Sequence, residues 1–319
     1  MSFLRVENLS KTYQLRKAFG GRSKEQVHAV DNVSFEVQKG ETLGIVGESG
    51  CGKSTLGRTI VRLEEPTSGR IFFDEEELTS KSQSQLRVVR KKIQMIFQDP
   101  YASLNPRRPI GKIVEEPMRV HGISGEERRE SALSLLAKVG LDADAYEKYP
   151  HQFSGGQRQR VVIARALSLN PSLVVADEPV SALDVSIQAQ VLNLFKDLQQ
   201  ELGLTYLFIA HDLGVVRHVS DRIAVMYLGK IVEMADAQSL YLQPAHPYTK
   251  ALLSANPRMD SADTQERIVL KGDIPNPINR PTGCSFHPRC PLAQEKCRSE
   301  EPQLLQISSG AQVACHFAS

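Results

Sequence analysis

The stretch Gly47-Glu48-Ser49-Gly50-Cys51-Gly52-Lys53-Ser54 fits the pattern G-x-x-x-x-G-K-S and follows the apolar run Leu43–Val46. A strand, a glycine-rich turn and a helix are expected in that order, which is the context that the pattern needs. Backbone N–H groups of such a loop, at a helix N-terminus, converge on phosphate oxygens. We therefore predict a nucleotide site in which Lys53 reaches the β- and γ-phosphates, Ser54 ligates Mg²⁺ and Thr55 bonds an α-phosphate oxygen.

A second motif places two carboxylates after a buried strand. The apolar run Leu173–Ala176 is followed directly by Asp177 and Glu178. Carboxyl ends of parallel strands meet at one edge of a sheet, so this pair is expected beside the phosphate loop. We expect Asp177 to support the Mg²⁺ shell and Glu178 to act as the general base that polarises the attacking water. A solvated acidic turn, the alternative, would leave the buried strand unexplained.

A short glycine motif lies upstream of that strand. Phe153-Ser154-Gly155-Gly156-Gln157 resembles the signature motif of ABC transporter ATPases, with Phe153 where Leu is most usual. The motif offers a hydroxyl from Ser154 and, from Gly155 and Gly156, backbone N–H groups that a ligand can approach closely. Such groups at the start of a helix suit a second phosphate clamp. The resemblance implies that this clamp closes over the ATP of a partner cassette. Two cassettes would then enclose two nucleotides head to tail.

The resemblance extends to single residues in the family's order. It implies that Gln98 touches Mg²⁺ or the water while its loop senses a membrane subunit, and that His211 bonds the γ-phosphate. It also implies that Tyr13 stacks on adenine and that Asp184 lies in a loop that crosses the dimer seam. Taken alone, each of these residues would more often have a structural role. We assign the functional roles because the residues occur together in the family's order.

The implied fold class is α/β, a P-loop NTPase ABC cassette with a RecA-like core, a β-subdomain and a helical subdomain, plus a small C-terminal Cys-rich extension. We expect the cassette at residues 1–243, the helical subdomain at about residues 100–165 and the extension at residues 244–319. Nine of the 17 prolines lie between Pro244 and Pro302, which favours a boundary near residue 244. One amphipathic helix is predicted after residue 185, with its apolar face made by Val191, Leu192, Phe195, Leu198 and Leu202.

Further segments narrow the resemblance to the ATPases of dipeptide/oligopeptide importers, closest to the F-type subunit of dipeptide permeases. They are Gln98–Tyr101 with Ser103–Pro106, Ala182–Ser186, and His246–Thr249. The resemblance implies ATP hydrolysis coupled to peptide import, together with a second ATPase subunit, two permease subunits in the membrane and an extracytoplasmic binding protein. Substrate selection belongs to those other subunits, so nickel chelates and glutathione stay open beside peptides.

Composition argues against other classes of function. The 39 basic and 37 acidic side chains leave a net charge of +2, so no broad positive field favours nucleic acid as a partner. A soluble ABC ATPase of DNA repair or maintenance would share the nucleotide motifs but usually carries long coiled-coil insertions, and no sustained heptads separate Lys53 from Ser154. A metal-sensing binding module would not need Glu178 and His211.

No membrane segment is expected. The N-terminus is polar, and no run approaches the ~20 apolar residues of a membrane span. The chain is therefore expected to stay in the cytosol and to attach to the cytoplasmic face of the inner membrane through a partner protein.

Four of the five cysteines fall in the last 36 residues, at Cys284, Cys290, Cys297 and Cys315. In a reducing compartment such a group favours a metal site over disulfides. Four thiolates suit a tetrahedral Zn²⁺ or a 4Fe–4S cluster, and the family resemblance favours the cluster; zinc and free buried thiols are the alternatives. The site would hold a tail with little core of its own, and its loss is expected to leave ATP binding intact.

Overall fold

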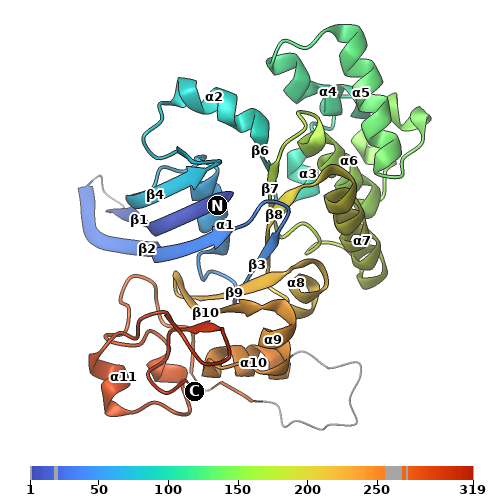
Figure 1. Ribbon diagram of the computed structural model, residues 1–319. Helices are drawn as coiled ribbons and strands as arrows, with labels where there is room; N and C mark the ends of the chain where they lie inside the picture. The colour runs from blue at the N-terminus through green and yellow to red at the C-terminus, as the bar shows by residue number, and fades with distance from the viewer. Residues whose placement is uncertain (1, 18–20, 256–267, 271, 319) are drawn as a thin grey trace. The chain divides into compact units, whose positions relative to one another are not determined.

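The computed structural model describes residues 2–17, 21–255, 268–270 and 272–318 (Figure 1). The chain divides into two compact units. Unit 1 comprises Met1–Gln38, Thr42–Ser80 and Ala210–Ser319, and unit 2 comprises Lys39–Glu41 and Lys81–Ile209. The segment predicted as an extension, 244–319, therefore belongs to the same unit as the N-terminal strands, and the boundary near residue 244 stays a prediction.

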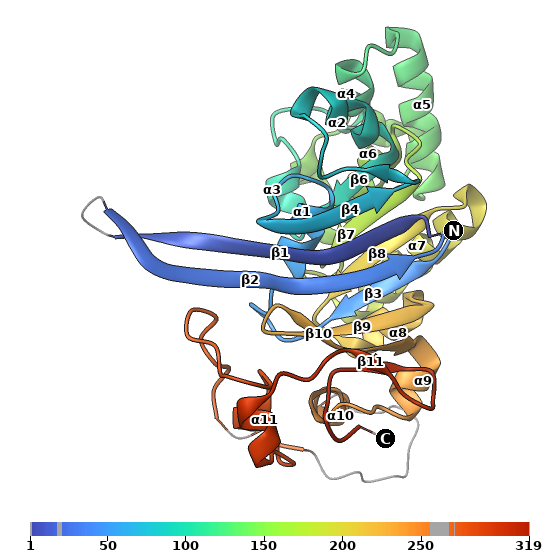
Figure 2. The same cartoon turned by 60° about the vertical axis from the view of Figure 1, so that its left-hand side comes forward.

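Unit 1 contains an antiparallel sheet with the strand order β2-β1-β4-β5. Its strands are β1 (Leu4–Lys17), β2 (Gly21–Val37), β4 (Ser68–Phe73) and β5 (Glu76–Glu77). Alternate side chains such as Leu4 and Val6 are buried, as expected for a sheet with one covered face. The hairpin of β1 and β2 extends well beyond β4 (Figure 2).

Unit 1 also contains a second run of strands in the order β11-β12-β10-β9-β3. β3 pairs with β9 in parallel, and the other pairs are antiparallel. The strands are β3 (Thr42–Val46), β9 (Arg222–Tyr227), β10 (Lys230–Asp236), β11 (Leu305–Gln306) and β12 (Gln312–Val313). The helices of the unit are α1 (Lys53–Ile60), α8 (Leu213–Val219), α9 (Ala237–Leu242), α10 (Pro247–Ala255), η3 (His287–Arg289) and α11 (Glu295–Ser299). Because β12 pairs with β10, the C-terminal segment is built onto this sheet.

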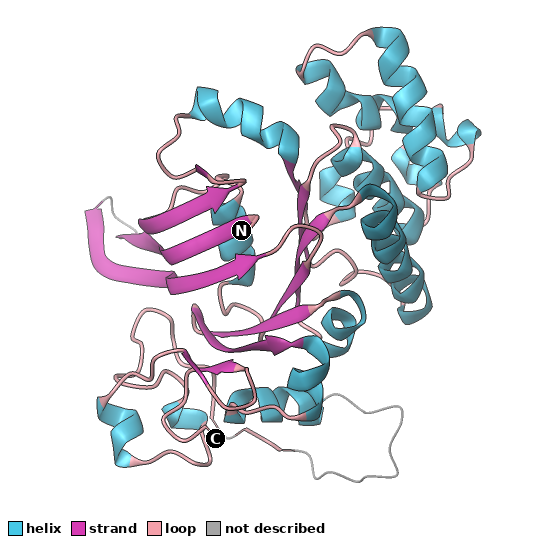
Figure 3. Ribbon diagram, viewed as in Figure 1, coloured by secondary structure: helices cyan, strands magenta, loops and turns pink. Residues whose placement is uncertain are grey.

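Unit 2 is built on three parallel strands in the order β8-β7-β6. They are β6 (Ile93–Ile96), β7 (Leu173–Asp177) and β8 (Thr205–Ala210), and every residue of β7 and β8 is buried. All the regular secondary structure between β6 and β7 is helical (Figure 3). The helices of the unit are α2 (Gln83–Lys92), α3 (Pro100–Ser103), α4 (Ile110–Val120), α5 (Gly125–Lys138), η1 (Ala143–Tyr146), η2 (Pro150–Gln152), α6 (Gly155–Leu167) and α7 (Val185–Leu202). Among the described residues, no helix has the length and apolar character needed to cross a membrane.

The predicted amphipathic helix is α7, and most of its predicted face is correct. Phe195 lies edge-on to Tyr206 and Phe208 of β8, with both ring centroids 5.5 Å away. Burial of an aromatic side chain of this kind contributes about 1.5–3 kcal/mol. The prediction was wrong for Leu202, which is 41% exposed. Leu202 is the last residue of α7 before Gly203, whose left-handed backbone ends the helix.

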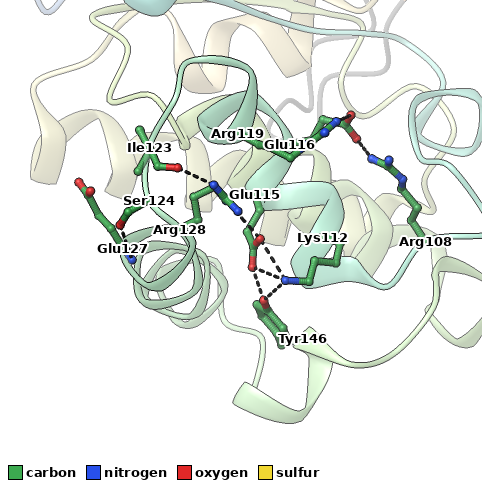
Figure 4. A network of polar contacts seen from close by, with 10 residues as sticks. All are labelled: Arg108, Lys112, Glu115, Glu116, Arg119, Ile123, Ser124, Glu127, Arg128 and Tyr146. Atoms are coloured by element: carbon green, nitrogen blue, oxygen red, sulfur yellow. Dashed lines mark hydrogen bonds and ion pairs between the residues drawn. The ribbon is translucent and has the colours of Figure 1, made fainter.

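A buried polar network holds the helical part of unit 2 together (Figure 4). The Glu115 side chain on α4 is only 5% exposed and accepts hydrogen bonds from Lys112 Nζ at 3.1 and 3.2 Å. The Tyr146 hydroxyl of η1 donates to Glu115, and Arg128 of α5 lies 3.6 Å from it. Although burial opposes ionisation, the Tyr146 and Lys112 hydrogen bonds hold the pKa of Glu115 below its ordinary value. The carboxylate thus joins three helical elements.

Replacing Glu115 by Gln is expected to lower the free energy of unfolding of unit 2 by about 1–2 kcal/mol, because charge-assisted bonds are weakened. The folded-state pKa is lowered, so this contribution is present above pH 4.5 and is lost as the pH falls through the folded-state value. Urea unfolding followed between pH 3 and pH 7 measures both effects. Glu116→Gln is the matched control, because Glu116 is 40% exposed and its ion pairs with Arg108 and Arg119 contribute little. Equal losses for the two variants would contradict the role given to burial.

Candidate nucleotide site

The predicted phosphate loop lies between β3 and α1 in unit 1. Gly52 ends the loop with a φ of 106°, and a Cβ atom there would lie 1.9 Å from the Ala29 carbonyl oxygen. A Cβ on Gly47 would lie 2.1 Å from the Met226 carbonyl oxygen. Both positions therefore require glycine. No side chain caps the N-terminus of α1, and a helix N-terminus of this kind favours an anion.

The Lys53 ammonium lies inside this loop. Lys53 is 3% exposed, and its Nζ donates to the carbonyl oxygens of Gly47 at 2.8 Å and Glu48 at 3.0 Å. A cation held at the mouth of a helix N-terminus suits an incoming phosphate. Burial raises the pKa of the Cys51 thiol, which disfavours the reactive thiolate at this position.

Two further predicted residues lie in unit 1. Tyr13 is on β1, where its hydroxyl bonds the Glu64 carboxylate and the Lys11 ammonium lies 4.9 Å from its ring centroid. The Lys11 cation therefore already lies against one face of that ring, and the stacking of adenine on Tyr13 stays a prediction. His211 follows β8 and is exposed, and the next residue, Asp212, caps α8 by accepting from Gly214 N at 2.6 Å. The cap fixes where the chain turns after His211.

Unit 2 brings two predicted catalytic residues together. Gln98 Nε2 donates to Glu178 Oε2 at 3.0 Å, although the residues are 80 positions apart in sequence. Glu178 has a φ of 46°, a left-handed conformation that costs about 1–2 kcal/mol for a residue with a Cβ atom. Its N–H donates to the Ile209 carbonyl oxygen at 2.9 Å, and the Ser181 hydroxyl donates to its carbonyl at 3.0 Å. These two bonds hold the turn in its left-handed conformation.

Asp177 is the last residue of β7 and is completely buried. Ionised carboxylates at such positions are stable only where cations or hydrogen-bond donors surround them. The carboxylate of Asp177 and the hydroxyl of Ser54 are hard oxygen donors, which is the ligand type that Mg²⁺ prefers. Each of these two side chains is therefore of the ligand type that the predicted ion needs, and a shared ion stays a prediction.

The signature motif opens α6 in unit 2. Ser154 is exposed, and its hydroxyl accepts from Gln157 N at 3.3 Å while Gln157 Oε1 accepts from Ser154 N at 3.0 Å. A Cβ on Gly156 would lie 2.4 Å from Ile187 Cγ2, so α6 and α7 pack too closely for any other residue. Phe153 is buried, so its difference from the usual Leu changes an apolar contact. The serine and the helix N-terminus thus face solvent as a preformed unit.

The loop before α7 is also exposed. Asp184 is the N-terminal flanking residue of α7, but its side chain makes no capping hydrogen bond. Gln188 Nε2 instead fixes the loop by donating to the carbonyl oxygens of Val180 at 3.0 Å and Leu183 at 2.9 Å. Asp184 is therefore held in place and open to a partner.

The four clustered cysteines line one cavity of about 190 Å³ in unit 1. Cys297 is buried and the other three are half-buried. Burial, with a smaller contribution from the neighbouring thiols, raises the pKa of the Cys284 thiol to about 11. Among the described residues, no three His, Cys, Asp or Glu side chains converge closely enough to hold a metal ion. The structure thus gathers the thiols around a space without showing a metal site.

Together, a phosphate loop between a parallel strand and a helix, a strand ending in two carboxylates and a serine–glycine helix start define an ATPase of the ABC cassette class. The ABC transporter family model matches residues 30–181, and the model of the oligopeptide/dipeptide transporter C-terminal region matches residues 232–297. The chain belongs to the ATP-binding proteins of the oligopeptide/dipeptide ABC transporter family. The family, the fold class and the ATPase activity predicted from the sequence are confirmed.

Two curated relatives show how far the similarity extends. The chain is 54% identical over 322 residues to the oligopeptide transport ATP-binding protein AppF of Bacillus subtilis, covering 100% of this chain and 98% of that protein. It is 53% identical over 313 residues to the dipeptide transport ATP-binding protein DppF of Haemophilus influenzae, covering 98% and 95%. Both alignments include the cassette and the C-terminal region.

A solved structure shares the cassette. The dimeric, post-hydrolysis state of the ATP-binding cassette MJ0796, bound to ADP and Pi, is 34% identical with a TM-score of 0.66. It covers 73% of this chain and 98% of that one. The fold of the cassette is thus shared with a nucleotide-bound protein.

Sequence reasoning missed two residues that contact the phosphate loop. The Tyr248 hydroxyl accepts a hydrogen bond from Glu48 N at 2.9 Å, and the Arg289 guanidinium pairs with the Glu48 carboxylate. Tyr248 lies in the His246–Thr249 segment, which served only to narrow the family. Arg289 directly precedes Cys290. The one signal that could have revealed its role is a charged residue in a cysteine-rich loop without a local partner.

Proposed function

We propose that this chain powers the uptake of dipeptides or oligopeptides across the cytoplasmic membrane, as a peripheral subunit on its cytoplasmic face. The observation that carries the proposal is the similarity of more than half of all residues to AppF, over 100% of this chain. The match to the oligopeptide/dipeptide C-terminal region supports it, because a generic cassette would not need residues 232–297. Nickel chelates and glutathione are the alternative cargoes.

In the proposed reaction, water attacks the γ-phosphorus of ATP, and the bond to the β-γ bridging oxygen breaks to give ADP and phosphate. Glu178 accepts a proton from the attacking water, and Gln98, 3.0 Å from Glu178, orients that water. Lys53 and the N–H groups of α1 balance the charge on the β- and γ-phosphates, and His211 bonds the γ-phosphate. Ser54 and Asp177 would hold Mg²⁺, which supplies further positive charge to the phosphates.

The nucleotide is proposed to be enclosed between two cassettes. The exposed Ser154 and the helix start behind it form an anion clamp, and Asp184 lies in an exposed loop. The similar cassette MJ0796 forms a dimer bound to ADP and Pi, which supports this arrangement. The proposed partners are a second, homologous ATPase subunit, two permease subunits and an extracytoplasmic binding protein.

The cargo is tested with the binding protein and permeases that assemble with this chain. Titration calorimetry with a dipeptide, a pentapeptide, a nickel chelate and glutathione identifies the ligand that the binding protein takes. A peptide is expected to bind and to stimulate ATP hydrolysis by the assembled complex. Binding of the nickel chelate or glutathione alone would assign the complex to that cargo and reject peptide import.

We further propose that the four-cysteine cavity holds a 4Fe–4S cluster, with Zn²⁺ as the alternative. The four thiols line one cavity, and Cys₄ ligation suits both a cluster and a zinc ion. The resemblance to the importer family favours the cluster. Cys284, Cys290, Cys297 and Cys315 would hold it, and the cluster would supply fixed links across the C-terminal segment.

Replacing Cys290 by Ser is the test of this cofactor. Anaerobic purification of the unaltered chain is expected to yield brown protein with iron and sulfide in equal amounts. The variant should be colourless and should be cleaved faster by protease after Pro281, because one link is lost. Cys51→Ser, outside the cavity, is the matched control and should stay brown. A colourless unaltered protein, with zinc or without metal, would overturn the proposal.

A further inference from the structure

Glu48 in the phosphate loop is fixed by three separate groups. Its carbonyl oxygen accepts from Lys53 Nζ at 3.0 Å, and its N–H donates to the Tyr248 hydroxyl at 2.9 Å. Its carboxylate accepts two bonds from Arg289, Nη1 to Oε2 at 2.7 Å and Nη2 to Oε1 at 3.1 Å. Two of the three groups come from residues 200 and 241 positions away, in the C-terminal segment of the same unit.

The groups that hold Glu48 are themselves rigid. Phe286 is 1% exposed and lies 5.3 Å from the Tyr227 ring and 5.4 Å from the Tyr248 ring, and those two tyrosine rings lie 4.7 Å apart. The Arg289 side chain is only 8% exposed. Packed aromatic rings and a two-point guanidinium–carboxylate pair both hold a fixed geometry.

Contacts from β10 hold the start of α10 in place. The buried Glu233 carboxylate of β10 accepts from Ala245 N at 2.8 Å and His246 N at 2.9 Å. The His246 Nδ1 in turn accepts from Tyr248 N at 3.1 Å. Because β10 holds the start of α10 in place, the Tyr248 side chain and its hydroxyl have a fixed position.

The charge of Glu48 makes this arrangement important for nucleotide binding. An uncompensated carboxylate in the loop would repel a triphosphate, since like charges within a few ångströms oppose each other. Arg289 neutralises that carboxylate, and the Tyr248 hydroxyl holds the N–H of the Gly47–Glu48 peptide, whose carbonyl oxygen accepts from the Lys53 ammonium. The C-terminal segment therefore supplies the cation that neutralises the carboxylate of the phosphate loop.

We propose that Arg289 and Tyr248 are positioning residues for ATP binding: the C-terminal segment clamps the phosphate loop through Glu48. The proposal rests on ATP binding at this loop and not on the identity of the transported cargo. The sequence alone led us to expect that ATP binding at Lys53 is independent of the tail. The contacts on Glu48 argue for the opposite, because the tail supplies two of its three partners.

Replacing Arg289 by Gln in the full-length chain is the main test, with affinity measured by fluorescence titration with a labelled ATP. We expect the affinity to fall about tenfold, because a charge-assisted pair is lost and the Glu48 carboxylate is left uncompensated. Adding Glu48→Gln to the Arg289→Gln variant should restore most of the affinity. Arg289→Lys should be intermediate, because one donor cannot make the two-point contact. Tyr248→Phe should weaken binding by a smaller factor.

Arg280→Gln is the matched control. Arg280 is a partly buried arginine of the same segment that pairs with Asp31 of β2 at 2.6 Å and does not contact Glu48. It should leave ATP affinity unchanged, with circular dichroism confirming that each variant is folded. Unchanged affinity in Arg289→Gln, or a loss that Glu48→Gln does not restore, would overturn the proposal. An equal loss in Arg280→Gln would show that only general loosening of the tail matters, and would also overturn it.

Discussion

Replacing Glu178 by Gln is expected to reduce ATP turnover by about 10²–10⁴-fold, the range that a general base contributes, while ATP affinity stays close to that of the unaltered chain. The amide keeps the shape of the side chain and an oxygen that can accept the 3.0 Å bond from Gln98. It removes the group that takes the proton from water. Steady-state hydrolysis and nucleotide titration, made on the assembled complex, measure the two quantities separately.

The control for this variant is Glu130→Gln, which neutralises an exposed carboxylate elsewhere in unit 2. It should leave both turnover and affinity unchanged. Turnover that survives in Glu178→Gln would remove Glu178 from the reaction. A parallel loss of ATP affinity would instead make it a binding residue.

The isolated chain is expected to hydrolyse ATP at least about 10²-fold more slowly than the assembled complex. The reason is that each phosphate loop needs the Ser154-type clamp of a partner, and removal of a single transition-state donor already costs about 10²–10³ in rate. Turnover per chain should fall on dilution, rise when the partner ATPase and permeases are added, and rise again with binding protein and its ligand. Full activity of a monomer at high dilution would contradict the head-to-tail arrangement.

Ser154→Asp sharpens this test. Asp caps helices as well as Ser does, so α6 should keep its N-terminus, whereas Ser154→Ala would also cost about 1 kcal/mol of stability. The introduced carboxylate would repel the partner's γ-phosphate. The variant should therefore bind ATP normally at its own loop and lose stimulation by the partner. Normal stimulation would show that Ser154 does not face a nucleotide.

The sequence was sufficient to predict the motifs whose chemistry is local. The loop from Gly47 to Ser54 and the strand before Asp177 are each continuous in sequence, so pattern and periodicity revealed them. A helix start at Ser154 was also predicted, and the structure adds the capping box that Ser154 forms with Gln157 three residues later. Such features depend on few neighbours and are readable without a structure.

The parts that the sequence did not predict depend on contacts between distant residues. The Arg289–Glu48 pair joins positions 241 apart, and the Glu115–Tyr146 bond joins positions 31 apart, with no periodicity linking either pair. The strained φ of Glu178 also had no signal in the sequence, because glutamate rarely adopts that conformation. The low apolar content of the tail was misleading, because the buried Phe286 packs against the rings of Tyr227 and Tyr248.

The central claim, that this chain converts ATP hydrolysis into peptide uptake, is tested most directly by transport into vesicles. The assembled importer is placed in liposomes with binding protein and a labelled dipeptide on one side and ATP with this chain on the other. The account predicts that dipeptide accumulates only with ATP, and that accumulation falls sharply when this chain carries Glu178→Gln. Accumulation that is unchanged by that variant, or hydrolysis that proceeds without dipeptide movement, would contradict it.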